Sequence, residues 1–201
     1  MKQARVASWS DVGGREAALV QRCAAGEQTA CTELVAEHQR MVVQLAMNLP
    51  GERDEALDLS QEVFLRVFRT IHRFRGQSSL RTWIYRIAVN QARNRHRFWR
   101  RRHRADQVSL DQHIAAHGDF VSAGEATPDR LLAQKELGER LQTALDHLPF
   151  DQRTAIVLRE IDGLSYEEIA FSLGLAVGTV KSRLTRARQA LRLELREART
   201  P

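Results

Sequence analysis

Apolar residues recur at steps of three and four along most of the chain, which is the period of amphipathic helices. Between residues 14 and 50 this pattern predicts two helices with a break near Gly26, and Pro50-Gly51 ends the second. A third helix follows, and its wide apolar stripe consists of Val63, Phe64, Val67, Phe68, Ile71 and Phe74. No alternating strand pattern competes with these segments, so we expect an all-α fold.

The next segment predicts a long basic helix. Ser79 is a plausible N-cap, and the expected buried stripe consists of Leu80, Ile84, Ile87 and Ala88. A second stripe repeats at steps of 4, 3 and 4 residues and contains Arg86, Asn90, Arg93 and Arg97. Arginine neutralises phosphate whatever the base sequence, whereas an amide can donate to and accept from a base edge. The asparagine within this row of arginines therefore suggests sequence-dependent nucleic-acid binding.

Aromatic side chains are interleaved with these cations. Trp83, Tyr85, Phe98 and Trp99 offer flat surfaces, which suit unpaired bases better than intact duplex. The alternative is that Trp83 belongs to the core and that Phe98 and Trp99 cover it at the helix end. Both readings of Trp83 stay open.

The face of the third helix opposite its apolar stripe is polar, with Asp58, Glu62, Arg66 and Arg69 at helical spacing. One interpretation is a solvated surface with ion pairs one turn apart. The other is a protein interface, which Leu65 favours because it lies beside the charges and off the buried stripe.

The C-terminal third begins with Thr127-Pro128, a cap followed by proline at the first helical position. A leucine stripe then runs to Pro149 through Leu131, Leu132, Leu137, Leu141, Leu145 and Leu148. We expect Asp151 to cap another helix, which contains Ala155, Ile156, Leu158 and Ile161 and ends at Asp162-Gly163.

The following stretch predicts a helix-turn-helix between about Tyr166 and Thr185. Ser165 and Glu168 form a capping box, Gly174 ends a short helix, and a new helix begins near Val177. The apolar residues of the second helix are Val180, Leu184, Ala187 and Leu191, and its outward residues are Lys181, Ser182, Thr185, Arg186, Arg188 and Gln189. A solvated hairpin is the alternative, but the capping box, the turn glycine and the basic face together favour insertion into a major groove.

Charged residues are distributed unevenly along the 201-residue chain. Lys and Arg exceed Asp and Glu by six, a balance that predicts affinity for a polyanion, yet residues 105–127 hold four acids and no Lys or Arg. We interpret this stretch as a flexible acidic linker between two small helical domains. The expected divisions are an N-terminal tail (1–13), a first domain (14–104), the linker (105–127), a second domain (128–196) and a C-terminal tail (197–201).

Other function classes find little support in the chain. No run of about 18 apolar residues suggests a membrane span, no export signal marks the N-terminus, and we expect a cytoplasmic protein. His113 and His117 have metal-like spacing but stand in the linker without a nearby cysteine pair. Gly-rich phosphate loops and G-x-S-x-G motifs are missing, so we expect no enzyme, metal or cofactor. Cys23 and Cys31 suggest helix packing, with redox sensing as the alternative.

Three blocks of sequence resemble the bacterial sigma factors of the extracytoplasmic-function group, and they occur in that family's order. They are DLSQEVFLRVFRTIHRFRG, SSLRTWIYRIAVNQARN and LPFDQRTAIVLREIDGLSYEEIAFSLGLAVGTVKSRLTRARQALR. The resemblance implies a region 2-like helical domain and a region 4-like helix-turn-helix domain. It also implies binding to core RNA polymerase, recognition of promoter −10 and −35 elements, and a response to envelope or environmental stress.

The resemblance also assigns roles to residues. The polymerase-binding positions are Asp58, Gln61, Glu62, Leu65, Arg66 and Arg69. The −10 positions are Arg75, Gln77, Ser78, Ser79, Trp83, Arg86, Asn90, Arg93 and Arg97, with Asn90 matching an asparagine that reads a flipped base. The −35 positions are Arg159, Lys181, Ser182, Thr185, Arg186 and Arg188, and Thr185 stands where close relatives have an aromatic residue.

The partners implied by the resemblance are core RNA polymerase, promoter DNA and a cognate anti-sigma factor, without membrane insertion. The acidic linker would occupy the RNA channel of the polymerase. The alternative function is a helix-turn-helix repressor or activator that is no polymerase subunit, which would leave the arginine–asparagine row of the first domain without a role.

Overall fold

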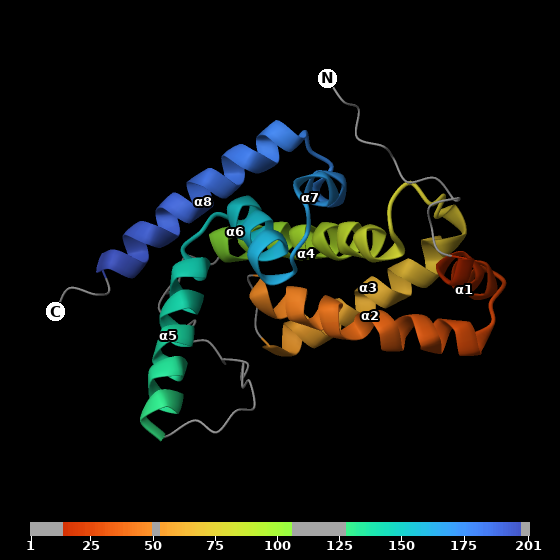
Figure 1. Ribbon diagram of the computed structural model, residues 1–201, viewed down its shortest axis with the longest axis horizontal. Coiled ribbons are helices and arrows are strands. Elements are labelled where there is room, and N and C mark those ends of the chain that lie inside the picture. Colours follow the sequence, from red (N-terminus) through yellow and green to blue (C-terminus); the bar gives the residue numbers. More distant parts are fainter. Residues whose placement is uncertain (1–13, 50–52, 106–127, 198–201) are drawn as a thin grey trace.

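The computed structural model describes residues 14–49, 53–105 and 128–197, and within these ranges it contains helices and no strand (Figure 1). The expected all-α fold is confirmed for this part of the chain. The two tails, the acidic linker, His113 and His117 lie outside the described residues.

Four α-helices and a short 3-10 turn form the N-terminal bundle. They are α1 (Gly14–Ala24), α2 (Gln28–Asn48), α3 (Arg53–Thr70), η1 (Ile71–Arg73) and α4 (Leu80–Ala105). Helix α2 packs against α1 and α3, while α4 packs against α3 and α2. The predicted break at Gly26 is confirmed, since this glycine adopts a φ of 85° between α1 and α2.

The start of α4 is fixed by two side chains. The Ser79 hydroxyl accepts the Thr82 N–H at 3.1 Å, as expected of an N-cap. Glu16 of α1 accepts the N–H of Leu80. Helix α1 thus contacts α4 at the residue where the 74–79 connection ends.

The C-terminal part contains α5 (Pro128–Asp146), α6 (Phe150–Ile156), a π-helical turn η2 (Val157–Ile161), α7 (Tyr166–Leu173) and α8 (Val177–Glu197). The predicted helix-turn-helix is confirmed: the Ser165–Glu168 capping box forms, and Gly174 is left-handed with a φ of 65°. The inner face of α8 buries Val180, Leu184 and Ala187 against its neighbours.

Two local predictions are wrong. Asp151 does not cap α6, whose N-cap is Pro149; its carboxylate lies instead 3.0 Å from Arg183 of α8. The leucine stripe is not buried throughout, because Leu145 and Leu148 are in the core while Leu137 is 63% and Leu141 41% exposed. Among the described helices, α5 packs substantially on α8 alone, so much of its apolar stripe meets no partner.

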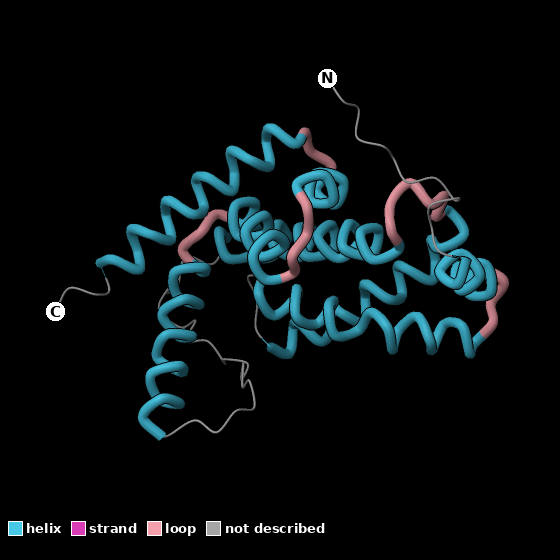
Figure 2. The backbone as a smooth tube through the Cα atoms, viewed as in Figure 1, coloured by secondary structure: helices cyan, strands magenta, loops and turns pink. Residues whose placement is uncertain are grey.

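The two halves of the chain lie directly against each other. In Figures 1 and 2, α4 crosses the centre of the molecule, with α7 above it and α2 and α3 below it, and α6 overlaps it in this view. The contact of α4 with α7 is among the most extensive between any two helices, and one continuous cluster of buried apolar residues runs through both halves. Sequence patterning predicted two domains but not this contact.

Candidate polymerase and nucleic-acid interfaces

The polar face of α3 is open to solvent. Its six candidate residues are all exposed, with Leu65 at 55%; they are Asp58, Gln61, Glu62, Leu65, Arg66 and Arg69. Leu57 is also 49% exposed and lies one turn before Gln61 on the same face. The sequence analysis missed Leu57, although its position off the buried stripe could have revealed it. Two exposed leucines among charges have the composition of a protein-binding surface.

A single arginine connects this face to α4. Arg95 donates to Glu62 at 2.9 Å and to the backbone carbonyl of Glu55 at 2.7 Å. Arg95 therefore links the two helices that carry the polymerase and −10 candidate surfaces.

The arginine–asparagine row of α4 faces the C-terminal helices. The Arg86 guanidinium lies 5.1 Å from the centre of the Phe171 ring of α7, and Arg93 lies 3.7 Å from the Asp151 carboxylate of α6. Asn90 and Arg97 of the same row are exposed. Arg86 and Arg93, two of the four residues of this row, therefore have a partner within the chain, although Arg86 is also exposed.

The 74–79 connection borders this row at the start of α4. Arg75, Gln77 and Ser79 are exposed there, and Ser78 is half-buried. Trp83 is half-buried and packs on Phe74 with ring centres 5.4 Å apart. Trp83 therefore belongs partly to the core, and its contact with a base stays a prediction.

Hydrogen bonds between α4 and the C-terminal half fix the contact. Thr82 donates to Glu168 at 3.2 Å, and Ser172 donates to the Thr82 carbonyl at 3.3 Å. Arg81 donates to the carbonyl oxygen of Asp162 at 3.0 Å. Burial alone would raise the pKa of Glu168, but hydrogen bonds from Ser165 and Thr82 hold it below its ordinary value. The capping carboxylate of the helix-turn-helix is thus charged and shared with α4.

Arg153 provides a second, buried connection between the halves. Its side chain is 1% exposed, donates from Nε to the carbonyl of Asn48 in α2 at 2.6 Å, and pairs with Asp146. A buried guanidinium is tolerated only where its charge and donors are satisfied. Sequence reasoning missed Arg153, Thr82 and Ser172, because isolated polar residues of this kind usually lie at the surface.

The outer face of α8 is open. Lys181, Ser182, Thr185 and Arg186 are all exposed. The hydroxyls of Ser182 and Thr185 donate to carbonyls of their own helix at 2.9 and 3.0 Å, which leaves their oxygens available as acceptors. Cations next to hydroxyls can contact phosphates and base edges in a major groove.

The two remaining −35 candidates lie at the edge of this face. Arg188 donates to Glu160 at 2.7 Å, and that hydrogen bond raises its pKa. Arg159 is half-buried, donates to the Leu164 carbonyl at 2.6 Å and stacks on Tyr166 at 4.8 Å. These contacts fix the positions of both guanidinium groups beside the four exposed residues, which are Lys181, Ser182, Thr185 and Arg186.

The described residues contain neither a candidate metal site nor a candidate membrane span. No group of three or more His, Cys, Asp or Glu there could hold a metal ion. No described helix is both long and apolar enough to cross a membrane.

Comparison with known proteins decides the family. Residues 34–104 match Sigma-70 region 2 and residues 138–191 match Sigma-70 region 4. The ECF RNA polymerase sigma-E factor of Escherichia coli K12 is 40% identical over 177 residues, which cover 86% of this chain and 90% of that protein. The chain belongs to the extracytoplasmic-function group of RNA polymerase sigma factors. The RNA polymerase sigma-H factor of Pseudomonas aeruginosa is 36% identical over 173 residues, with coverage of 86% and 90%.

Solved structures of sigma factors share the fold. RpoE from Bartonella quintana, solved in complex with the anti-sigma factor NepR, has a TM-score of 0.67 and 27% identity, covering 82% of this chain and 96% of that one. CnrH in complex with the cytosolic domain of CnrY has a TM-score of 0.64 and 25% identity, with coverage of 92% and 99%. The present sigma factor is thus a promoter-directing subunit of RNA polymerase, and the alternative of an independent repressor or activator finds no support.

Proposed function

We propose that three surfaces of this sigma factor have separate roles in promoter recognition. The exposed face of α3 docks on core RNA polymerase, the 75–79 loop and the α4 row read the −10 element, and the outer face of α8 reads the −35 element. The observation that carries the proposal is that each surface occupies a different helix, so all three can be engaged at once in an extended chain.

The chemistry of the two DNA surfaces differs. Asn90 offers an amide to the Watson–Crick edge of a flipped −10 base, with Arg86 and Arg93 available for its phosphates. Lys181, Ser182, Thr185 and Arg186 contact intact duplex at −35 through the major groove. The protein itself catalyses no covalent step: base capture offsets the cost of unpairing, and the polymerase performs the synthesis.

The closed arrangement has to open for this function. The −10 and −35 elements are separated by about 25 base pairs, roughly 85 Å of duplex at 3.4 Å per base pair. Helices α4 and α7 lie in direct contact, with Thr82 and Glu168 hydrogen-bonded across the boundary. One molecule therefore cannot contact both elements of a promoter until the C-terminal half has left α4.

Polymerase binding supplies the free energy for opening. A partner that binds the open form more tightly shifts the equilibrium by its differential affinity. Once one DNA contact forms on the polymerase, tethering raises the effective concentration of the other. The free protein is therefore expected to bind whole promoters weakly.

We further propose a protein inhibitor as a partner. The sigma factors RpoE and CnrH have folds similar to this chain and were solved with NepR and CnrY, respectively. An inhibitor that prefers the closed arrangement would keep α7 against α4, and it would block docking on the polymerase by covering the exposed α3 face itself. The acidic linker in the RNA channel and the stress response stay predictions.

Polymerase docking is tested by Leu65→Asp, which places a charge in the centre of the exposed α3 face. Leu193 of α8 is also 55% exposed and lies far along the sequence from that face, so Leu193→Asp is the matched control. We expect Leu65→Asp to weaken binding to core polymerase at least about 30-fold, because a charged residue at an interface centre costs about 2 kcal/mol or more, while the control binds normally.

Transcription from a promoter template with purified core polymerase completes the test. Wild-type chain and Leu193→Asp should both support it, and Leu65→Asp should not. Equal binding of the two variants to polymerase would show that α3 is the wrong docking surface. Normal polymerase binding without any promoter-specific transcription would contradict the division of the two DNA surfaces.

A further inference from the structure

Two cysteines lie against each other in the α1–α2 hairpin. The Sγ atoms of Cys23 and Cys31 are 2.9 Å apart, and both residues are free thiols. A disulfide bond is about 2.05 Å long, so the two sulfurs need to approach by only about 0.9 Å to form one. Neither the polymerase surface nor the DNA surfaces use this pair.

The backbone between the cysteines is held by local hydrogen bonds. Gly26 N–H donates to the Cys23 carbonyl at 3.0 Å, and Cys31 N–H donates to the Glu27 carbonyl at 3.1 Å. Gly26 takes the left-handed conformation that this tight connection requires. These hydrogen bonds stabilise a turn that places the start of α2 opposite the end of α1.

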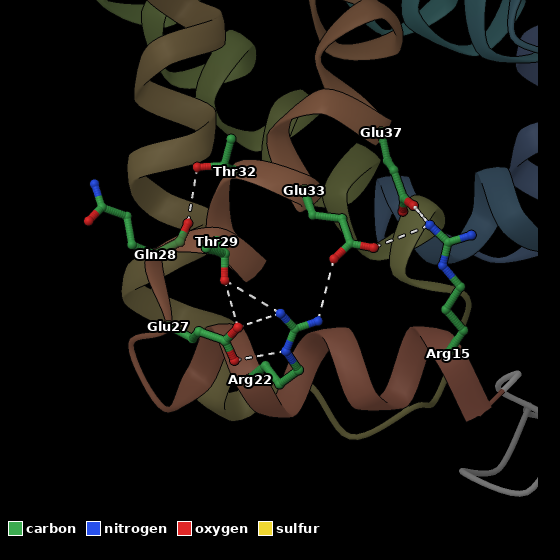
Figure 3. A network of polar contacts seen from close by, with 8 residues as sticks. All are labelled: Arg15, Arg22, Glu27, Gln28, Thr29, Thr32, Glu33 and Glu37. Atoms are coloured by element: carbon green, nitrogen blue, oxygen red, sulfur yellow. Dashed lines mark hydrogen bonds and ion pairs between the residues drawn. The ribbon is translucent and has the colours of Figure 1, made fainter.

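Ion pairs on the outer side of the hairpin keep the two helices aligned (Figure 3). Arg22 donates from Nε to Glu27 at 2.8 Å and lies 3.5 Å from Glu33, while Arg15 lies 2.6 Å from Glu37. Each pair is exposed and contributes little stability on its own. Together they join α1 to α2 at several points without involving the sulfurs, so the thiols stay adjacent in either oxidation state.

The two thiols differ in accessibility. Cys23 is buried, with 5% exposure, and burial together with its contact to the Cys31 sulfur raises its pKa to about 12. Cys31 is half-buried and therefore open to small reagents. The pair has the arrangement of a reacting thiol and a resolving thiol, in which the accessible sulfur is oxidised first and the buried sulfur closes the bond.

We propose that Cys23 and Cys31 form an oxidisable dithiol, which a hydroperoxide converts to an intramolecular disulfide that ties α1 to α2. The pairing distance and the hairpin geometry carry this inference, and it is independent of the roles proposed for the polymerase and DNA surfaces.

The reaction has two balanced steps. The Cys31 sulfur attacks one peroxide oxygen, so that an S–O bond forms, the O–O bond breaks, and water leaves when the oxidant is hydrogen peroxide. The Cys23 sulfur then attacks the Cys31 sulfur; the S–S bond forms, the S–O bond breaks, and the thiol proton of Cys23 leaves with the hydroxyl as a second water. Two thiols are oxidised by two electrons, and one peroxide is reduced. Proximity compensates for the low acidity of Cys23.

The disulfide would restrict α1, which contacts the residues on either side of the 74–79 connection. Helix α1 packs on η1, and its Glu16 accepts the N–H of Leu80 at the first residue of α4. A covalent bond at the other end of α1 restricts the motion of this helix, and with it the capping of α4. Oxidation is therefore expected to stiffen the region next to the 75–79 loop.

Mass spectrometry of the full-length protein tests the bond directly. No Lys or Arg separates Cys23 from Arg40, so trypsin releases both cysteines in a single peptide that spans residues 23–40. After brief treatment with a roughly tenfold excess of hydrogen peroxide, we expect this peptide to be about 2 Da lighter and to resist alkylation, and dithiothreitol to restore both properties. Two freely alkylated thiols, a sulfinic acid on Cys31 or a disulfide between two molecules would each overturn the proposal.

Two variants and a second measurement distinguish an oxidisable dithiol from two cysteines that only pack against each other. Cys31→Ser, at the half-buried position, should keep the fold and lose the mass shift, while Cys23→Ala should stop at the sulfenic acid of Cys31, which a dimedone probe traps. Peroxide should slow hydrogen exchange of the α1 amides at least about fivefold in the wild-type chain and not in Cys31→Ser. Equal exchange in oxidised and reduced wild-type protein would show that the bond has no structural effect.

Discussion

The two surfaces proposed to read DNA have similar chemistry but different neighbours within the chain. The α4 row meets the C-terminal half of its own chain, with Arg86 stacked on Phe171 and Arg93 paired to Asp151. The outer face of α8 exposes Lys181 and Arg186, and the ring that Lys181 approaches, Tyr166 at 5.7 Å, belongs to the same helix-turn-helix. The free molecule can therefore present its −35 surface while its −10 surface stays partly covered. Recognition of duplex can precede recognition of unpaired bases without any separate inhibitor.

The largest expected effect comes from removing the buried connection between the halves. Arg153→Ala removes the buried hydrogen bond to the Asn48 carbonyl across the boundary, together with the ion pair to Asp146 inside the C-terminal half. We expect the closed arrangement to lose about 3 kcal/mol, roughly a 100-fold change in the ratio of closed to open molecules. Small-angle X-ray scattering would detect it as a larger radius of gyration at unchanged helix content.

Arg140→Ala is the matched control for this experiment, because Arg140 is exposed on α5 and takes part in no ion pair among the described residues. Its scattering should equal that of the wild-type chain. An Arg153→Ala protein that stays compact would show that the contact of α4 with α7 alone holds the halves together.

Replacing Asn90 tests the α4 row, in which Asn90 itself is exposed, in the assembled polymerase. Asn90→Ala should reduce discrimination between a matched and a substituted −10 element by about 2 kcal/mol, roughly 30-fold, because a base edge loses its amide partner. Open-complex formation by the holoenzyme on the two templates measures it. Gln39→Ala, at an exposed amide of α2, is the control. Equal loss of polymerase binding and −10 preference would mean that the two faces are misassigned.

Replacing Arg186 tests the open surface and should act without polymerase. Arg186→Ala should weaken binding of the free chain to −35 duplex about tenfold, or about 1.4 kcal/mol, and should lower the salt dependence as well if the guanidinium contacts phosphate. Arg192, exposed on another face of α8, is the control. Asn90→Ala should leave this affinity of the free chain unchanged; a comparable loss would end the contrast between covered and open surfaces.

The half-buried carboxyl of Asp162, at the boundary between the halves, predicts the smallest effect, on pH dependence. Burial raises the pKa of Asp162 from 3.8 to about 6, so the folded state holds a proton that the unfolded state releases between these values. The free energy of unfolding should therefore fall as pH rises from about 4 to about 6 and level off above. Asp162→Asn should remove this slope and stabilise the chain by about 1 kcal/mol at pH 7. Urea unfolding at several pH values measures both, and an unchanged slope in the variant would assign it to another group.

Local chemistry made much of the fold predictable. Ser79 and Ser165 cap their helices as their positions beside apolar runs suggested, and Gly174 ends α7 where a left-handed residue was needed. Helical periodicity separated the buried and exposed faces of α3 and α8, so the polymerase and −35 candidates were found from the sequence. These features depend on residues close together in the chain.

Contacts between distant segments were not predictable in the same way. Thr82 and Ser172 are short polar residues that are 2% and 1% exposed. Each is buried because the opposite half of the chain covers it. Arg153 resembles a surface cation until Asn48 and Asp146 are placed around it. Leu137 and Leu141 illustrate the reverse case, since an apolar stripe indicates which face could be buried and not whether a neighbour covers it.

The stacking of Arg86 on Phe171 has a consequence for how this molecule can be controlled. A guanidinium keeps its positive charge throughout the physiological pH range, and it is not the amine that acetyltransferases modify. Neither acidification nor acetylation can therefore silence this cation. The motion of a helix toward or away from it remains as a means of control, so the proposed affinity of the row for nucleic acid would be governed by geometry rather than by chemical neutralisation.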